Sequence, residues 1–236
     1  MTLSRRSLIR CSAAAFAAGF APLSALAAGA APQKASPWVR KLKAARGATQ
    51  IVVVAAIGKT TAWVSMHEKG EDGRWREVMT TPGFIGKNGL GKTKEGDGKT
   101  PVGTFRFTRA FGLARNPGCA ISYTHVNEHL YWSGDPRPGM RYNELVDIRR
   151  HPRLSKQDSE HLIEYPVHYK YALNISYNEK GEPGLGSAIF MHCFGPKWPY
   201  TGGCVALPED KMLYVMRHVK PDCVVVIDSA EALGIA

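Results

Sequence analysis

A histidine and a cysteine near the C-terminal end of the sequence have the types and spacing needed for nucleophilic catalysis. His192 precedes Cys204 by twelve residues, and Gly202 and Gly203 stand directly before the cysteine. A free thiol is mostly protonated at neutral pH, so an imidazole that takes or shares its proton is the usual way to activate it. The pair therefore predicts a cysteine nucleophile with His192 as its base.

The two glycines before Cys204 predict a tight turn that presents the sulfur. Glycine adopts positive φ and leaves neighbouring backbone N–H groups unshielded. Such groups can stabilise the oxyanion of an acyl-transfer intermediate, and we expect the N–H groups of Gly203 and Cys204 to do so. The alternative for Cys204 is a small buried residue or half of a disulfide.

The elements that must position this pair are a strand and a turn. Residues 188–191 have the apolar character of a buried strand, so His192 is expected at the end of a rigid element beside a loop. Cys193 follows directly, and on a continuing strand its side chain points to the opposite face. We therefore expect Cys193 to be structural.

The rest of the chain predicts a mainly β domain with one or two short helices. Strands are expected at residues 51–55, 62–66, 74–80, 102–108 and 223–227. A short helix is expected at 159–164 and a clear one at 208–219, where Pro208 suits the first turn. The segment from Gly83 to Lys99 holds six glycines and many charges, which is typical of a loop that borders a site.

The N-terminal residues predict export. An Arg5-Arg6 pair precedes an acid-free apolar run, residues 13–26, that ends in the small-residue triplet Ala25-Leu26-Ala27. This pattern indicates a twin-arginine signal peptide over residues 1–27 and a periplasmic protein. A membrane anchor is the alternative, but the run is short for a bilayer span and is interrupted by a glycine and a proline. No stable membrane insertion is expected after cleavage.

Length and composition indicate a single catalytic module. The 236 residues fit one domain, expected at residues 49–236, behind a segment rich in Ala, Lys and Arg at 28–48 that predicts a tether or a short surface helix. Loss of the leader removes three arginines and no acid, which lowers the net charge from +11 to +8. A basic surface attracts polyanions, and outside the cytoplasm these are cell-wall polymers and anionic lipids rather than nucleic acid. The alternative is that scattered basic residues only maintain solubility.

Neither the cysteines nor the histidines have metal-ligand spacing. Four cysteines follow the leader, at positions 119, 193, 204 and 223, without a Cys-x-x-Cys pair, and the eight histidines form no cluster. No metal or other cofactor is therefore expected. An oxidising compartment permits disulfides among the four cysteines, and their pairing and the oligomeric state stay open.

The stretch from His192 to Cys204 resembles the active-site segment of the L,D-transpeptidase catalytic domain family, also called YkuD. Residues 96–105 resemble the family's Thr-Pro-x-Gly-x-Phe hairpin, and residues 186–192 resemble its histidine-bearing strand. Tyr131-Trp132-x-x-Asp135-Pro136 and Tyr142-Asn143 resemble blocks of one subgroup. The matches follow the family's order from about residue 50 to residue 228.

The resemblance implies a fold, a substrate and site residues. It implies the family's β-sandwich or barrel-like fold, with Cys204 as the acylated nucleophile and His192 as general base and acid. Its substrates are peptidoglycan stem peptides, and its reaction needs neither ATP nor metal. Residues expected to contact substrate are Thr201, at the motif's Ser/Thr position, and Tyr200, Trp132 and Asp135.

The resemblance also leaves the second half of the reaction open. Cys204 would attack the L,D bond before the terminal D-Ala, and an amine of a neighbouring stem would resolve the thioester into a three-to-three cross-link. Gly202 and Ala206 replace polar residues common in the family, and the loop between His192 and Cys204 is short. Hydrolysis by an L,D-carboxypeptidase or endopeptidase is therefore an alternative. An alternative of another class is a catalytically silent wall-binding module with Cys204 in a disulfide.

Overall fold

Strands make up most of the regular structure of the chain. The computed structural model describes residues 34–235, and the predicted signal peptide, residues 1–27, lies outside them. The strands are β1 (Lys34–Ala35), β2 (Gln50–Ala56), β3 (Thr61–Lys69), β4 (Trp75–Phe84), β5 (Gly103–Gly112), β6 (Tyr123–His125), β7 (Leu130–Ser133), β8 (Glu144–Asp147), β9 (Glu160–His161), β10 (Ala172–Ile175), β11 (Phe190–Cys193), β12 (Val205–Leu207) and β13 (Val224–Ser229). The helical elements are α1 (Glu209–His218) and the 3-10 turns η1 (Pro37–Lys41), η2 (Lys43–Arg46), η3 (Leu162–Glu164) and η4 (His168–Lys170).

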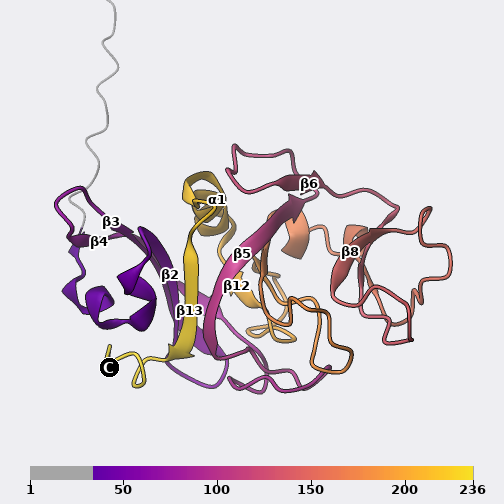
Figure 1. Cartoon of the computed structure of the whole chain (residues 1–236), viewed down its shortest axis with the longest axis horizontal. Coiled ribbons are helices and arrows are strands. Elements are labelled where there is room, and N and C mark those ends of the chain that lie inside the picture. Colours follow the sequence, from indigo (N-terminus) through magenta and orange to yellow (C-terminus); the bar gives the residue numbers. More distant parts are fainter. Residues whose placement is uncertain (1–33, 236) are drawn as a thin grey trace, which may run out of the picture. The chain divides into compact units, whose positions relative to one another are not determined.

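The larger sheet closes on itself. Within residues 34–235 it has ten strands in the order β1-β4-β12-β11-β10-β5-β13-β2-β3, with β6 beside β5, and β3 also pairs with β4. Figure 1 shows β5 and β13 side by side, where they pair antiparallel. The mainly β, barrel-like fold expected from the sequence is confirmed. The predicted strands at 51–55, 62–66, 74–80, 102–108 and 223–227 correspond to β2, β3, β4, β5 and β13, each somewhat longer than expected.

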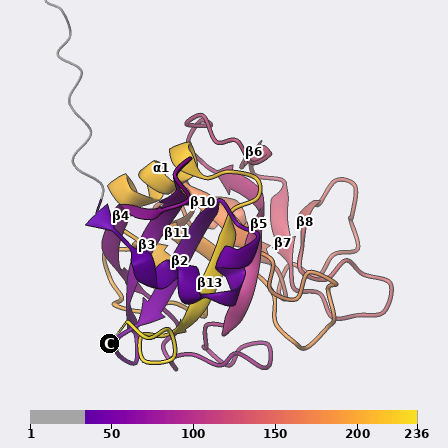
Figure 2. The ribbon, with the colours of Figure 1, turned by 60° about the vertical axis from the view of Figure 1, so that its left-hand side comes forward.

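The segment before β2 is packed against the sheet. In η1 and η2, Val39 and Ala45 are buried in one cluster with Ile51 of β2 and Val226 of β13. Figure 2 shows these turns, in indigo, over β2 and β13. The described part of the predicted tether, residues 34–48, is therefore folded and docked, because its apolar side chains face the sheet while its basic side chains face solvent.

The long helix α1 closes one side of the core. Met212, Val215 and Met216 are fully buried among residues of the sheet. The helix lies where the sequence predicted one, but Pro208 is its N-cap rather than part of its first turn. None of the helices in the described chain combines the length and apolar character required to cross a membrane.

A second, three-stranded sheet, in the order β8-β7-β9, carries residues that the site uses. Glu160 in β9 lies opposite Trp132 in β7. The short helix expected over residues 159–164 is wrong in its first half, because Glu160 and His161 pair with β7 and only Leu162–Glu164 form a 3-10 turn.

Candidate active site

Two adjacent parallel strands place His192 and Cys204 on one face of the sheet. In β11 and β12, Met191 pairs with Val205 and His192 pairs with Ala206. Paired residues of neighbouring strands point the same way, and side chains alternate along each strand. Cys204 immediately precedes β12, so it shares the face of His192 and Ala206. The register thus explains how residues twelve apart in sequence come to line one pocket.

Cys193 lies on the other face, as expected from the alternation. It is 1% exposed and belongs to the apolar cluster that contains Met191 and Val205. The four cysteines of the described residues all carry free thiols, so Cys204 is not held in a disulfide.

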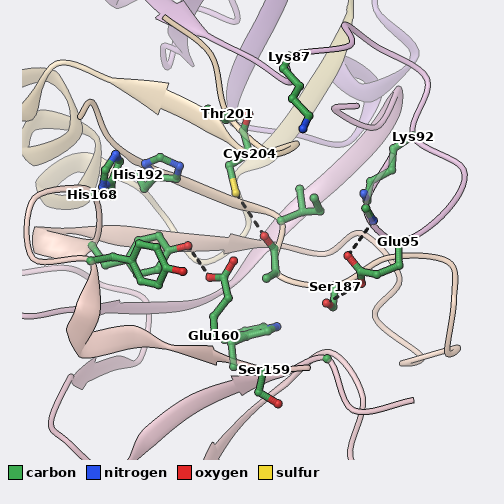
Figure 3. A pocket seen from close by; sticks show the side chains of 18 of the residues that line it. Lys87, Lys92, Glu95, Ser159, Glu160, His168, Ser187, His192, Thr201 and Cys204 are labelled. Atoms are coloured by element: carbon green, nitrogen blue, oxygen red, sulfur yellow. Dashed lines mark hydrogen bonds between the residues drawn. The ribbon is translucent and has the colours of Figure 1, made fainter. Parts of the chain in front are cut away.

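Cys204 and His192 open into a pocket with a volume of about 940 Å³ (Figure 3). The loop from Gly83 to Lys99 borders it, through Phe84, Lys87, Lys92, Glu95 and Gly96. Opposite walls come from the second sheet and from the turn η4. Charged and polar side chains that line the pocket include Lys87, Glu95, Glu160, His168, Ser187 and Thr201.

The Cys204 thiol is hydrogen-bonded to backbone in the unliganded pocket. Its Sγ–H donates to the carbonyl oxygen of Ala188 at 3.2 Å, and the N–H of Phe190 donates to the sulfur at 3.3 Å. The residue is 8% exposed, and burial raises the pKa of the thiol to about 12. The resting nucleophile is therefore a protonated thiol held in one orientation.

His192 is a neutral imidazole with one nitrogen free. Its Nδ1 lies 2.8 Å from the carbonyl oxygen of Cys193, which can only accept, so Nδ1 carries the proton and Nε2 has the lone pair. Burial lowers the pKa of His192 to about 4. The rings of His168 and Tyr169 pack at its edges, with centroids 5.8 and 5.6 Å away. No hydrogen bond joins His192 to Cys204 within residues 34–235, so thiol and imidazole rest as an un-ionised pair.

The turn before Cys204 depends on one of its two glycines. Gly203 has a φ of 144°, and a Cβ there would lie 2.7 Å from the carbonyl oxygen of Lys99, whereas Gly202 has open space and no positive φ. The Gly203 N–H donates to Thr201 Oγ1 at 3.0 Å, and the Thr201 hydroxyl donates to the Cys204 carbonyl at 2.7 Å. Of the two expected oxyanion donors, only the Cys204 N–H has no hydrogen-bond partner in the described chain.

An asparagine holds the backbone segment whose carbonyl accepts the hydrogen bond from the Cys204 thiol. Ala188 has a φ of 54°, a conformation that costs a non-glycine residue about 1 kcal/mol or more. Its N–H donates to Asn143 Oδ1 at 3.0 Å, and the Trp132 indole N–H donates to the same oxygen at 2.9 Å. Trp132 lines the pocket, as expected. Its indole N–H orients the Asn143 side chain, which in turn holds Ala188, the residue whose carbonyl contacts the Cys204 sulfur.

Two of the remaining predicted substrate contacts differ in their placement. Tyr200 lines the pocket beside the exposed ring of Trp198, with centroids 5.7 Å apart. Asp135 does not line it. Its buried carboxylate accepts hydrogen bonds from the Arg137 side chain at 2.6 and 2.8 Å and from the Ser155 N–H at 2.8 Å. The Arg137 guanidinium holds the pKa of Asp135 well below its usual range. Asp135 thus links its own loop to Ser155, and its fully buried side chain, outside the pocket lining, does not fit the substrate contact expected from the sequence.

Sequence reasoning missed several side chains of the pocket, among them Glu160, His168 and Tyr169. Glu160 belongs to β9 of the second sheet, and His168 and Tyr169 belong to the turn η4, so they come from elements outside the segment that carries His192 and Cys204. No motif surrounds them in the sequence, and only the tertiary structure brings them together.

The chain belongs to the L,D-transpeptidase catalytic domain (YkuD) family, whose model matches residues 50–227. This match covers both β11 and β12 and the loop that borders the pocket. No curated protein matches the sequence.

Solved structures similar to the chain include the helical cell shape determining protein Pgp2 from Campylobacter jejuni, at 19% identity and a TM-score of 0.42, covering 77% of this chain and 48% of Pgp2. Mycobacterium tuberculosis L,D-transpeptidase 1 is 14% identical with a TM-score of 0.34, covering 77% and 62% of the two chains. An L,D-transpeptidase from Stackebrandtia nassauensis is 15% identical with a TM-score of 0.35, covering 78% and 57%. The matched part thus spans less than two thirds of each of these proteins.

Proposed function

We propose that the chain is a cysteine L,D-transpeptidase of peptidoglycan stem peptides. The observation that carries the proposal is the common pocket face of Cys204 and His192, in a chain of the L,D-transpeptidase catalytic domain family. Cys204 is the nucleophile and His192 the general base. The Cys204 N–H is the donor left for the oxyanion.

The reaction starts when a stem peptide enters the pocket with the carbonyl of its L,D bond beside the sulfur. His192 Nε2 takes the thiol proton as Sγ attacks, and gives it to the departing D-Ala amine. The resulting thioester is resolved by an amine of a second stem. The un-ionised resting state of Cys204 and His192 suits this order of steps. The thiol proton moves to His192 only when substrate displaces the thiol from the Ala188 carbonyl.

Incubation of residues 28–236 with a disaccharide tetrapeptide tests the proposal, with products identified by mass spectrometry. We expect release of D-Ala and formation of a cross-linked dimer. Cys204→Ala should release no D-Ala, whereas Cys193→Ala, the matched cysteine on the core face, should retain the activity. Tripeptide without dimer would identify a carboxypeptidase instead, and absence of D-Ala release would contradict the enzyme assignment.

We also propose that residues 1–27 direct the chain to the periplasm through the twin-arginine pathway. The Arg5-Arg6 pair before an acid-free apolar run supports this. Replacement of both arginines by lysine should keep the full-length protein in the cytoplasm of a host with this pathway, as measured by fractionation. Unchanged export of the lysine variant would contradict the proposal.

A further inference from the structure

Glu160 is a carboxylate of the pocket without a cationic partner. It accepts a hydrogen bond from the Tyr169 hydroxyl at 2.6 Å (Figure 3). No Lys, Arg or His nitrogen lies within 4 Å of it in the part of the chain that the structure describes. Its near neighbour along the chain, Glu164, instead points away and contacts His161 at 2.9 Å.

The surroundings of Glu160 disfavour its charged form. Burial raises the pKa of Glu160 to about 7; the hydrogen bond from Tyr169 partly offsets this effect, and the Glu95 carboxylate adds to it. Tyr165, Tyr169 and Cys204 interact with it as well, and none of these is a cation. The cationic side chains of the same pocket are Lys87 and Lys92; neither pairs with Glu160, and Lys92 is held by Asp97 at 3.1 Å. An unpaired carboxylate in a partly dry site is costly unless a cation arrives to compensate it. Glu160 is therefore a pocket carboxylate that lacks a cation, in the same pocket as the nucleophile.

The location of Glu160 indicates which step such a cation would serve. Glu160 and Cys204 line the same pocket (Figure 3), and a charged Glu160 carboxylate disfavours the Cys204 thiolate by like-charge repulsion. Tyr169, which orients the carboxylate, also packs against the His192 ring at 5.6 Å between centroids. A cation bound at Glu160 would thus lie in the pocket that holds the acyl group, and Tyr169 contacts both this carboxylate and the ring of the base.

We propose that Glu160 binds the ammonium group of the acceptor and takes the proton that the acceptor must lose before it attacks the thioester. The proposal rests on the function proposed above and names a residue for its second step. It assigns to the pocket a preference for acceptors that bear a primary ammonium group over neutral or anionic ones.

The step balances without any further reactant. One proton passes from the ammonium nitrogen to the Glu160 carboxylate, and the neutral amine attacks the thioester carbonyl. The carbon–sulfur bond breaks, and its electron pair stays on the Cys204 sulfur. The second proton of the amine reaches that sulfur through His192 Nε2, which restores the neutral thiol and imidazole. Glu160 then returns its proton to solvent.

Glu160→Gln separates this role from the first step. With tetrapeptide as donor and acceptor, the ratio of dimer to tripeptide should fall about 10- to 100-fold, the usual effect of losing a hydrogen bond to a charged group. Glu164→Gln is the matched control and should keep the wild-type ratio. The variants' melting temperatures establish that both are folded.

A neutral nucleophile provides the decisive comparison. Hydroxylamine is uncharged at neutral pH and needs no ammonium site, so hydroxamate formation by Glu160→Gln should match that of the wild type per thioester formed. Equal loss of dimer and hydroxamate would mean that Glu160 only supports the fold of the pocket, and would overturn the proposal.

The two proposals fail in different ways. Wild-type protein that releases no D-Ala contradicts the proposed function and this inference together. Wild-type protein that releases D-Ala and forms dimer, while Glu160→Gln keeps the same dimer-to-tripeptide ratio, contradicts the role of Glu160 alone.

Discussion

Cys193 ends strand β11 and Cys204 directly precedes the neighbouring parallel strand β12; both are buried, yet they face different regions of the molecule. Burial raises the pKa of Cys193 to about 11 and that of Cys204 to about 12. Cys193 packs in the apolar core under α1, whereas Cys204 faces the pocket. Burial and thiol acidity therefore do not distinguish the nucleophile from the core cysteine. The distinguishing features of Cys204 are its access to the pocket and to His192, whose Nε2 has a free lone pair.

His67 and His192 repeat the contrast between a structural region and the site. Burial lowers the pKa of both to about 4. In β3, both ring nitrogens of His67 have partners, Ser65 Oγ at 2.8 Å and Ser36 Oγ at 3.0 Å, so the ring fastens the docked N-terminal segment. His192 has a partner only at Nδ1, and its Nε2 is left for chemistry.

The largest expected effect separates the two histidines. His192→Gln should lower the rate of D-Ala release about 100- to 10,000-fold, the usual contribution of a general base, with little loss of stability. His67→Gln should leave the rate unchanged and lower the free energy of unfolding by about 1 to 3 kcal/mol, because buried serine hydroxyls lose a partner. Rates and urea unfolding curves of the two variants check this. A comparable loss of rate in both would break the distinction.

Substitutions on the core face of the sheet, under α1, should change the stability of the protein and leave its catalytic rate unchanged. Met212→Ala removes a fully buried side chain beneath the sheet and should cost about 2 to 5 kcal/mol in the free energy of unfolding. The rate per folded molecule should stay at the wild-type value, because Met212 does not line the pocket. Denaturant unfolding, with active sites counted by thioester formation, measures both. A lower rate per folded molecule would contradict this, because it would show that the core face of the sheet affects the pocket face.

The two glycines before Cys204 should differ although they are neighbours. Gly203→Ala combines positive φ with a close approach to the Lys99 carbonyl and should cost about 1 to 3 kcal/mol. Gly202→Ala meets open space and should change stability by less than about 0.5 kcal/mol. Thermal melts of the pair are sufficient. Equal destabilisation would contradict the conformation of the turn.

The smallest effect concerns Glu160 and depends on pH. Its pKa is raised in the folded protein, from 4.5 to about 7, so the stability contributed by the neutral carboxyl is present below pH 4.5 and lost as pH rises through 7. Glu160→Gln should therefore match the wild type at pH 4 and be more stable by about 1 to 2 kcal/mol at pH 8. Unfolding at the two pH values tests the sign, and a variant less stable at pH 8 would contradict it.

Sequence patterns alone determined the features that depend on local spacing. The strands from β2 to β5 and β13, the helix α1, the alternation that separates His192 from Cys193, and the family follow from periodicity and motif order. The same local reasoning placed Cys204 after a glycine turn. It could not tell that Gly203 rather than Gly202 carries the positive φ, because that depends on the Lys99 backbone packed against the turn.

Only the tertiary structure decided the rest of the site. Glu160 and Tyr169 reach the nucleophile because β9 pairs with β7 and η4 packs beside β11, and contacts between such distant segments leave no periodic signal in the sequence. The same reason turned Asp135 from a predicted substrate contact into a partner of Arg137. It also decided between the two expectations for the segment before β2, a tether or a short surface helix: residues 37–46 form 3-10 turns whose apolar side chains pack on the sheet, a contact that the sequence of the segment alone does not reveal.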